Sequence, residues 1–443
     1  MSITLSENAR FIIEKLAQCG FDCYAVGGCV RDSLRGVEPK DWDFTTDALP
    51  DEIEACFFDC KTVAVGKKYG TIAVILDGVQ YEITTFRVDG EYKDSRHPET
   101  VLFSKELKDD LSRRDFTVNA MAYNPEKGLV DLFDGRRDLQ YAVIRCVGDP
   151  EKRFEEDALR ILRALRFASV FNFTIEPQTH SAILKLGSTL TDIASERIVA
   201  ELNRLLCGEN VASILRRFKQ VFAVFIPELA STFGFEQNSP HHNRTVYRHL
   251  VASVKNIEPD PILRTTMLFH DIAKPLSHTT DEFGKSHYKN HPMLGAAMAE
   301  KIMKRLCYPN HFIDEVTTLI RHHDDRIKPD TVIVKKYLGL LKADMMRKLL
   351  KVQRADILAQ SMYQREEKLR NLDAVEKETE RILSSSECYE LSMLAISGRD
   401  IIHLGVGSGK QIGEILHTLL NMVINGEVDN SAEELLSEAR KLI

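Results

Sequence analysis

The sequence predicts an α+β fold in which a small mixed-sheet head is followed by helical domains. In the first 145 residues, β-branched runs of strand length occur, and two of them are joined by the turn signal Asp77-Gly78. From Asp149 onward, apolar residues recur at helical spacing, and Pro150 fits the first position of a helix capped by Asp149. A chain of 443 residues is long enough for about three domains.

Composition is typical of an ordinary globular protein. Hydrophobic residues make up 44% and charged residues 28%, which excludes the disordered and fibrous classes. We expect neither a signal peptide nor a membrane span, because the N-terminal stretch reads as a capped amphipathic helix and no long apolar run follows. The nine cysteines lack C-x-x-C pairs, which predicts reduced thiols in a cytoplasmic protein and no zinc finger. A net charge of −7 still allows an anionic partner if basic residues gather on one face.

Two adjacent glycines, Gly27 and Gly28, follow an apolar strand-like run and precede a helix-like segment. Glycine lets backbone N–H groups approach a phosphate closely, and the start of a helix favours an anion. Arg31, one turn into that segment, would add a charged donor. The pattern predicts a cradle for a polyphosphate.

Asp41 and Asp43 follow this cradle and flank Trp42. In a strand this alternation sends both carboxylates to one face. Two carboxylates that share two Mg²⁺ ions suit phosphoryl-group displacement. One ion activates the attacking hydroxyl, and the other stabilises the oxygens of the leaving phosphate. Most isolated D-x-D pairs are solvated turns, but the Gly-Gly pair at this spacing resembles the nucleotidyltransferase signature. Glu82, on the second hairpin strand, is either a third metal carboxylate or an exposed glutamate.

Residues 156–166 are predicted to continue the helix that begins at Pro150. Asp157 and Arg160 would share one helical face, and Glu156 would brace Arg160 from one turn away. An acceptor beside a donor matches the Watson–Crick edges of cytosine and adenine and clashes with those of uracil and guanine. Taken alone, the pattern is more typical of a surface salt-bridge helix.

Five segments in order make the chain resemble the class II CCA-adding enzymes, which are tRNA nucleotidyltransferases, and the related bacterial poly(A) polymerases. These segments are VGGCVRD, KDWDFTT, RRDFTVNAMA, EEDALRILRALRF and SERIVAELNRLL. The resemblance implies a nucleotidyltransferase head (1–145), a helical neck (146–207), a helical body (208–365) and a tRNA-binding helical tail (366–443). It also implies that an NTP binds between head and neck.

The resemblance further assigns roles to residues of these motifs. Asp41 and Asp43 would be catalytic and would hold Mg²⁺, while Asp157 and Arg160 would form a protein template that selects C or A. The remaining nucleotide-binding positions are Gly27, Gly28 and Arg31 at the triphosphate, Arg114, Asp115 and Asn119 near the sugar, and Arg163 and Arg166 toward the phosphate or primer end.

Residues 87–112 carry Gly, Pro and dense mixed charge, which predicts a mobile active-site loop. They match the family's flexible loop at full length, and this favours complete CCA synthesis or A addition over CC addition alone. The predicted activity is addition of CCA to tRNA 3′ ends from CTP and ATP, by attack of the primer 3′-OH on the α-phosphate. A poly(A) polymerase or A-adding enzyme of the same family is one alternative. A phosphodiesterase with a nucleotide-binding head is another.

Four residues on predicted helices form an H…HD…D series: His249, His270, Asp271 and Asp356. The series resembles the HD metal-dependent phosphohydrolases, and its imidazole and carboxylate groups suit a divalent ion. We expect metal binding here and leave turnover of a substrate open. His291 and His322 are candidates for a second ion or a phosphate.

Residues 332–354 alternate apolar and basic positions at helical spacing. Such a pattern favours an ordinary amphipathic helix with a solvated Lys/Arg face. The alternative is a basic strip that follows tRNA through phosphate contacts.

Overall fold

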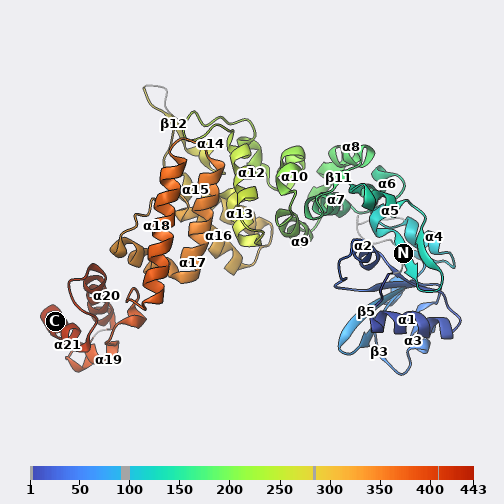
Figure 1. The fold of residues 1–443 in the computed structure, drawn as a ribbon, viewed down its shortest axis with the longest axis horizontal. Helices are drawn as coiled ribbons and strands as arrows, with labels where there is room; N and C mark the ends of the chain where they lie inside the picture. The colour runs from blue at the N-terminus through green and yellow to red at the C-terminus, as the bar shows by residue number, and fades with distance from the viewer. Residues whose placement is uncertain (1–2, 91–99, 283–285, 408) are drawn as a thin grey trace. The chain divides into compact units, whose positions relative to one another are not determined.

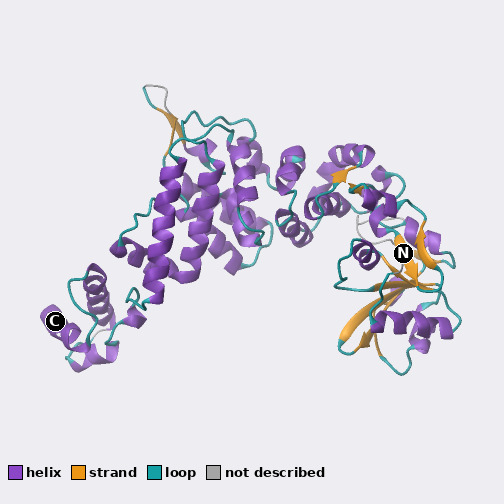
Figure 2. Cartoon of the chain, in the orientation of Figure 1, coloured by secondary structure: helices purple, strands orange, loops and turns teal. Residues whose placement is uncertain are grey.

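The computed structural model describes residues 3–90, 100–282, 286–407 and 409–443. Its contacts divide the chain into two compact units, Met1–Pro227 and Glu228–Ile443 (Figure 1). The first unit holds a large sheet, whereas the second is helical apart from the short hairpin β12 (His278–Thr280) and β13 (Ser286–Tyr288) (Figure 2). The α+β class is therefore confirmed.

A seven-stranded mixed sheet forms the centre of the first unit, in the order β3-β4-β5-β2-β1-β8-β9. Strands β2 and β5 are parallel, and the other neighbours are antiparallel. This order places β1, β2 and β5 side by side, so that the predicted cradle and the predicted carboxylates share the middle of one sheet. The strands are β1 (Cys23–Val26), β2 (Asp43–Thr46), β3 (Lys61–Gly66), β4 (Thr71–Leu76), β5 (Val79–Thr85), β8 (Met121–Asn124) and β9 (Gly128–Asp131).

Local signals set several head elements as predicted. Helix α1 (Glu7–Gln18) begins after Ser6, whose hydroxyl accepts from the Ala9 N–H, and it packs with α3 (Pro50–Cys56) in the main apolar core of the head. The β4–β5 hairpin turns through Asp77 and Gly78 with φ of 50° and 78°. Two left-handed residues make the turn that suits the twist of a hairpin.

The described ends of the predicted loop 87–112 are regular structure. Strands β6 (Arg87–Asp89) and β7 (Val101–Phe103) pair antiparallel, and helix α4 (Leu107–Ser112) follows. Residues 91–99 of the predicted loop lie outside the described residues. The rest of the head comprises η2 (Thr117–Asn119), α5 (Gly135–Gln140) and β10 (Val143–Ile144), which pairs with β11 (Thr174–Ile175).

Helices follow from Asp149, which caps α6 (Pro150–Glu156) as predicted by accepting from the Glu151 N–H. The prediction of one continuous helix through residues 156–166 is wrong. Asp157 is extended, with φ −146° and ψ 102°, and a new helix, α7 (Leu159–Val170), begins two residues later. The Asp157 carboxylate accepts from the Leu159 N–H at 3.0 Å, so an aspartate that caps a helix start competes with helix continuation here. The unit continues with α8 (Pro177–Leu186), α9 (Ser195–Leu206), α10 (Val211–Arg217) and α11 (Lys219–Phe225).

The second unit contains a helical bundle and a smaller C-terminal group of helices with its own apolar cluster. Its longest helix, α17, is interrupted at Lys342, where φ is 66° and ψ is 164°. No helix among the described residues is long and apolar enough to cross a membrane. The helices are α12 (Val246–Asn256), α13 (Pro261–Phe269), α14 (Lys274–Ser277), α15 (His291–Arg305), α16 (Asn310–His322), α17 (Thr331–Ala359), α18 (Arg365–Ser384), α19 (Gly398–His403), α20 (Gly409–Asn425) and α21 (Ala432–Leu442).

Basic side chains of residues 332–354 are largely engaged with acidic partners. The pairs within this unit are Lys335–Glu387, Lys342–Glu390, Arg347–Glu380, Lys348–Glu315, Lys351–Glu258 and Arg354–Asp373. Charge that is already paired within the protein attracts phosphate less. The structure thus disfavours the tRNA-following strip, and the amphipathic segment consists of two helices that meet at Lys342.

Candidate active site and metal centre

The Gly-Gly turn joins β1 to a short helix, α2 (Gly28–Leu34). Gly27 has φ 82° and ψ −125°, a conformation that L side chains rarely adopt, and its N–H donates to the Met121 carbonyl at 3.1 Å. A Cβ at Gly27 would lie 3.0 Å from Nη1 of Arg114. The turn therefore lets a cationic side chain approach the backbone closely, as a polyphosphate cradle needs.

Of the predicted metal carboxylates, Asp43 is the first residue of β2 and Asp41 lies two residues before the strand. Asp41 and Asp43 are exposed and Trp42 between them is buried at 8% exposure, so the predicted alternation is present. Glu82 is the register partner of Asp43 on the parallel strand β5, which places both side chains on one face. Although part of the Asp43 side chain is exposed, desolvation by the surrounding protein raises its pKa. Arg114 opposes this shift, and the charges of Glu82 and Asp41 add to it.

These three carboxylates concentrate negative charge at one place on the sheet, and a divalent cation bound there would relieve it. Among the described residues, Asp41, Asp43 and Glu82 do not form a set whose ligand atoms all lie within 4.8 Å of one another. The metal-ligand roles of Asp41 and Asp43 stay predictions, as does that of Glu82.

A hydrogen-bonded chain connects the Gly-Gly helix to the neck. Arg31 is buried and donates from Nη1 to Oδ1 of Asn119 at 2.5 Å. The Asn119 amide donates to Oδ1 of Asp115 at 3.1 Å. Oδ2 of Asp115 accepts from Nε and Nη2 of Arg163, at 2.9 and 2.6 Å. Four predicted nucleotide-binding residues from distant motifs are thus joined side chain to side chain.

Asp115 is the ionic centre of this chain. Burial alone would raise its pKa, but the Arg163 guanidinium and the Asn119 amide outweigh that effect and hold the pKa at about 2. Arg31, by contrast, donates hydrogen bonds to Asp32 as well as to Asn119. Its guanidinium also stacks on Phe171, 4.7 Å from the ring centroid. Its predicted contact with a triphosphate stays a prediction.

Of the two predicted template residues, Asp157 lies in the break between α6 and α7, and Arg160 lies in the first turn of α7. Arg160 donates from Nη1 to Oε2 of Glu156 at 2.7 Å, which is the brace expected from the sequence, and from Nη2 to the Arg113 carbonyl at 3.2 Å. Asp157 Oδ2 accepts from Nη2 of Arg197 on α9 at 3.0 Å. Nucleotide selection by Asp157 and Arg160 is not tested by this geometry.

Sequence reasoning missed two residues, Arg197 and Glu201. They pack α9 against α7, the helix that bears Arg160. Glu201 is buried and pairs with Nε of Arg166 at 2.5 Å, and it lies 3.9 Å from Nη1 of Arg163. Both residues belong to the motif SERIVAELNRLL and stand four residues apart, which places them on one helical face. This four-residue spacing of opposite charges is the sequence pattern that could have identified both residues.

In the second unit, four predicted ligands gather into one buried cluster. Nε2 of His249 lies 2.8 Å from Oδ1 of Asp356, 3.3 Å from Oδ2 of Asp271 and 3.2 Å from Nε2 of His270. The ligand atoms of all four residues lie within 4.8 Å of one another. Helices α12 and α17 and the turn that follows α13 thus bring together side chains that are up to 107 residues apart, from His249 to Asp356.

A second group shares Asp271. Its Oδ1 lies 3.3 Å from Nε2 of His291 and 3.5 Å from Nε2 of His323, and the two imidazoles are 3.3 Å apart. The prediction of His322 at this position is wrong: its Nδ1 pairs with Asp325 at 2.7 Å. Adjacent residues at a helix end point about 100° apart, so only one of the two neighbouring histidines can face the cluster.

The donor atoms of these groups fit a divalent cation. Nδ1 of His270, His291 and His323 lies 2.7–2.9 Å from a backbone carbonyl, which orients Nε2 of each ring into the cluster as in metal sites. Oδ1 of Asp271 and Oδ1 of Asp356 are buried without a hydrogen bond among the described residues.

The buried carboxylates of the cluster already have one cationic partner, because Nζ of Lys274 lies 2.6 Å from Oδ2 of Asp271. Burial lowers the pKa of His249, but its contacts with Asp271 and Asp356 outweigh that and raise the pKa to about 9. A proton would thus be held there to balance the buried carboxylates. Metal binding at this cluster stays a prediction that its geometry favours.

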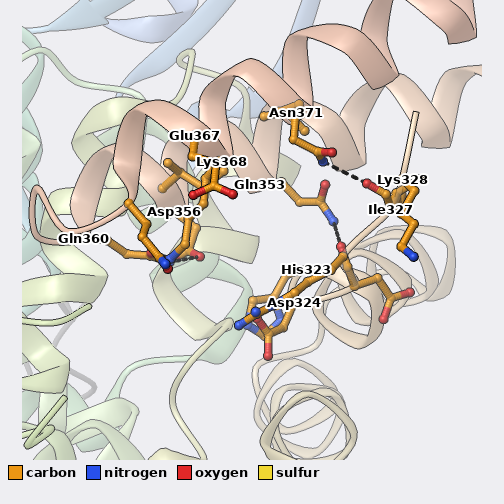
Figure 3. Close-up of a pocket in the computed structure, with 15 residues that line it drawn as sticks. His323, Asp324, Ile327, Lys328, Gln353, Asp356, Gln360, Glu367, Lys368 and Asn371 are labelled. Atoms are coloured by element: carbon orange, nitrogen blue, oxygen red, sulfur yellow. Dashed lines mark hydrogen bonds between the residues drawn. The ribbon is translucent and has the colours of Figure 1, made fainter. Parts of the chain in front are cut away.

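A cavity of about 320 Å³ opens beside this cluster (Figure 3). Asp356 and His323, one from each ligand group, are among its lining residues. Lys368 on α18 donates from Nζ to Oε1 of Gln360 at 2.6 Å, and Gln360 donates to Oδ2 of Asp356 at 2.7 Å. A cationic side chain is therefore connected to a ligand carboxylate at the wall of an accessible cavity.

Three family profiles match the chain. The Poly A polymerase head domain matches residues 23–145, the RNA and SrmB-binding site of polymerase A matches 172–233, and tRNA nucleotidyltransferase domain 2 matches 292–439. Among solved structures, the Bacillus stearothermophilus CCA-adding enzyme in complex with CTP superposes with a TM-score of 0.68 at 28% identity. That match covers 98% of this chain and 96% of that one.

Curated relatives are CCA-adding enzymes. That of Staphylococcus haemolyticus is 46% identical over 228 residues, which span 51% of this chain and 56% of that enzyme. That of Enterococcus faecalis is 34% identical over 98% of this chain and 96% of that enzyme. That of Geobacillus stearothermophilus is 33% identical over 97% of this chain and 95% of that enzyme. A relationship that spans both chains at this identity shows that the chain belongs to the family of CCA-adding enzymes.

Proposed function

We propose that this protein adds CCA to tRNA 3′ ends from CTP and ATP, and that it does so in the cytoplasm. The observation that carries the proposal is the hydrogen-bonded chain from Arg31 to Arg163, because it connects the Gly-Gly turn to the helix that bears Arg160. Membership of the CCA-adding family supports it over the full length of the chain. A poly(A) polymerase built on the same head is the nearest alternative.

Asp41 and Asp43, with Glu82 beside them, would hold Mg²⁺, which when bound supplies activation of the primer hydroxyl and stabilisation of the phosphate oxygens. The new bond joins the primer 3′ oxygen to the α-phosphorus, and the bond to the β-phosphate bridging oxygen breaks, so pyrophosphate leaves. Arg114 lies beside Gly27 and would offset the charge of the triphosphate. No covalent intermediate with the protein is required.

Asp157 and Arg160 would select the incoming base. An ionised carboxylate only accepts and a guanidinium only donates, so the pair suits the amino group and ring nitrogen of cytosine and adenine. Uracil and guanine would leave buried polar groups unpaired, which is where discrimination arises. Glu156 fixes Arg160 by the hydrogen bond at 2.7 Å.

The test is extension of a tRNA transcript that ends before CCA, with CTP, ATP and Mg²⁺. We expect three added nucleotides with the natural chain and loss of extension with Asp43→Asn. The matched control is Glu38→Gln, which removes an exposed carboxylate from the loop that leads to Asp41 and should extend normally. Equal extension by Asp43→Asn and the natural chain would refute the catalytic role of Asp43.

A second activity, hydrolysis of phosphate esters at this histidine and aspartate cluster, is favoured by one observation. Asp271 joins two ligand groups, and one residue of each group, Asp356 and His323, lines a cavity. We propose that His249, His270, Asp271 and Asp356 bind one divalent ion. His291 and His323 would complete a second position through the other oxygen of Asp271. When bound, such ions polarise a phosphoryl oxygen and lower the pKa of a bound water.

Metal content tests this second proposal without relying on activity. We expect the purified chain, after dialysis against Mn²⁺, Ni²⁺ or Zn²⁺, to retain up to two equivalents that His270→Ala removes. His311→Ala is the control, because His311 is exposed on α16 and belongs to neither ligand group. Equal metal content in the natural chain and His270→Ala would contradict the proposal. Release of phosphate from p-nitrophenyl phosphate is measured separately on both proteins.

A further inference from the structure

Two groups hold the carboxylate of Asp157, one of them two residues along the chain and the other on α9. Asp157 lies in the extended break between α6 and α7. Oδ1 accepts from the Leu159 N–H, and Oδ2 accepts from Nη2 of Arg197, both at 3.0 Å. Each carboxylate oxygen has two lone-pair directions, so each retains one direction for a further donor.

Arg197 lies on α9, which also contacts α7, the helix that bears Arg160, at a second point. Arg197 lies in the first turn of α9, and Glu201, one turn later on the same face, pairs with Arg166 of α7. The two contacts have opposite polarity: α9 presents a cation to Asp157, in the break before α7, and an anion to Arg166, on α7 itself. This arrangement fixes the register between α9 and α7.

We propose that Arg197 is a positioning residue for base selection, which fixes the Asp157 carboxylate so that it accepts from the amino group of cytosine or adenine. The inference rests on the proposed template role of Asp157. An aspartate side chain exchanges between staggered rotamers unless a partner favours one of them. Arg197 is that partner and leaves an acceptor direction open.

A purely structural role for the pair predicts a different outcome. The side chains of Arg197 and Asp157 retain 23% and 15% of their exposure, so water reaches both. Loss of a partly exposed ion pair changes stability little. Selectivity, by contrast, depends on where the acceptor stands relative to the base, and a small displacement has a large effect on a reaction.

The experiment compares base discrimination in the full-length chain. On a tRNA ending before CCA, kcat/KM is measured for CTP and UTP, and on a tRNA ending in CC, for ATP and GTP. We expect Arg197→Ala to lower both discrimination ratios at least tenfold, while the urea midpoint followed by Trp42 fluorescence stays unchanged. Arg197→Lys, which keeps one charged donor, should restore part of the ratio.

The matched control is Arg204→Ala. Arg204 lies on the same helix and is exposed, and among the described residues its side chain has no hydrogen bond or ion pair. We expect natural discrimination from this variant. In addition, Asp157→Ala combined with Arg197→Ala should discriminate no worse than Asp157→Ala alone, because Arg197 acts through Asp157.

The possible outcomes distinguish the positioning role of Arg197 from the template role of Asp157 on which it depends. Natural discrimination by Asp157→Ala would overturn the template role itself. Lost discrimination by Asp157→Ala together with natural discrimination by Arg197→Ala and Arg197→Lys would overturn the positioning role alone. An equal loss of kcat/KM for all four nucleotides in Arg197→Ala would also overturn it, since a general structural defect lowers every rate without favouring the wrong base.

Discussion

Replacement of Asp115 by asparagine should destabilise the first unit by about 2 kcal/mol at pH 7. The two bonds from Arg163 and the bond from Asn119 lower the pKa of this buried carboxyl from 3.8 to about 2. A shift of about 1.8 pKa units corresponds to about 2.4 kcal/mol of preference for the ionised form in the folded state. Asparagine has a similar shape but carries no charge, so it loses this contribution.

The pH dependence of the effect has a definite sign. A pKa that is lower in the folded state contributes stability above the unfolded pKa, here about 3.8, and loses it as the pH falls toward the folded value. The difference in unfolding free energy between the natural chain and Asp115→Asn should therefore be constant from pH 7 to about pH 5. About half of it should remain at pH 3.

Urea unfolding followed by Trp42 fluorescence reports on this unit selectively, because Trp42 is the only tryptophan and is buried in the head core. Asp22→Asn is the control, since it removes an ion pair with Lys127 in which both side chains are about half exposed. Such a pair contributes roughly 0–1 kcal/mol. Equal urea midpoints for Asp115→Asn and the natural chain at pH 7, or an undiminished difference at pH 3, would refute the reasoning.

Three further changes have expected outcomes. Lys342→Gly should raise the thermal midpoint of the second unit, measured by circular dichroism, because φ 66° with ψ 164° costs a non-glycine residue roughly 1–3 kcal/mol; Lys342→Ala should not raise it. Gly78→Ala should destabilise the head by about 1 kcal/mol in the Trp42 assay, because φ is 78° at the hairpin turn. Glu82→Gln should raise the Mg²⁺ concentration for half-maximal extension about tenfold or more if Glu82 is a ligand, and an unchanged requirement would exclude that role.

Local signals in the sequence predict local structure here. The Asp77-Gly78 turn and the cap at Asp149 depend on residues within a few positions of one another, and both are present in the structure. The alternating exposure of Asp41 and Asp43 is likewise a short-range property of an extended segment. These elements could be predicted because their causes lie inside a short window.

Other features depend on partners that are distant in sequence. Residues 150–170 have the apolar spacing of one helix, but Arg197, forty residues beyond Asp157, stabilises the break by pairing with its carboxylate. The choice of His323 over His322 depends on how α16 ends relative to Asp271. Periodicity carries no information on the contact with Arg197. It does separate the two histidines, because His323 follows Val316 and Ile320 by seven and three residues on the buried face of α16, and His322 does not.

The measurement that tests the central claim most directly uses the purified chain with Mg²⁺ and three tRNA transcripts, which end before CCA, after C and after CC. Each is incubated with each NTP singly and with all four together. The account predicts C, C and A in order and then a stop, with only A added to the transcript that ends in CC. Addition of A alone would mean an A-adding enzyme, and long A tails would mean a poly(A) polymerase. Absence of extension on all three transcripts would contradict the account and leave the body cluster as the working site.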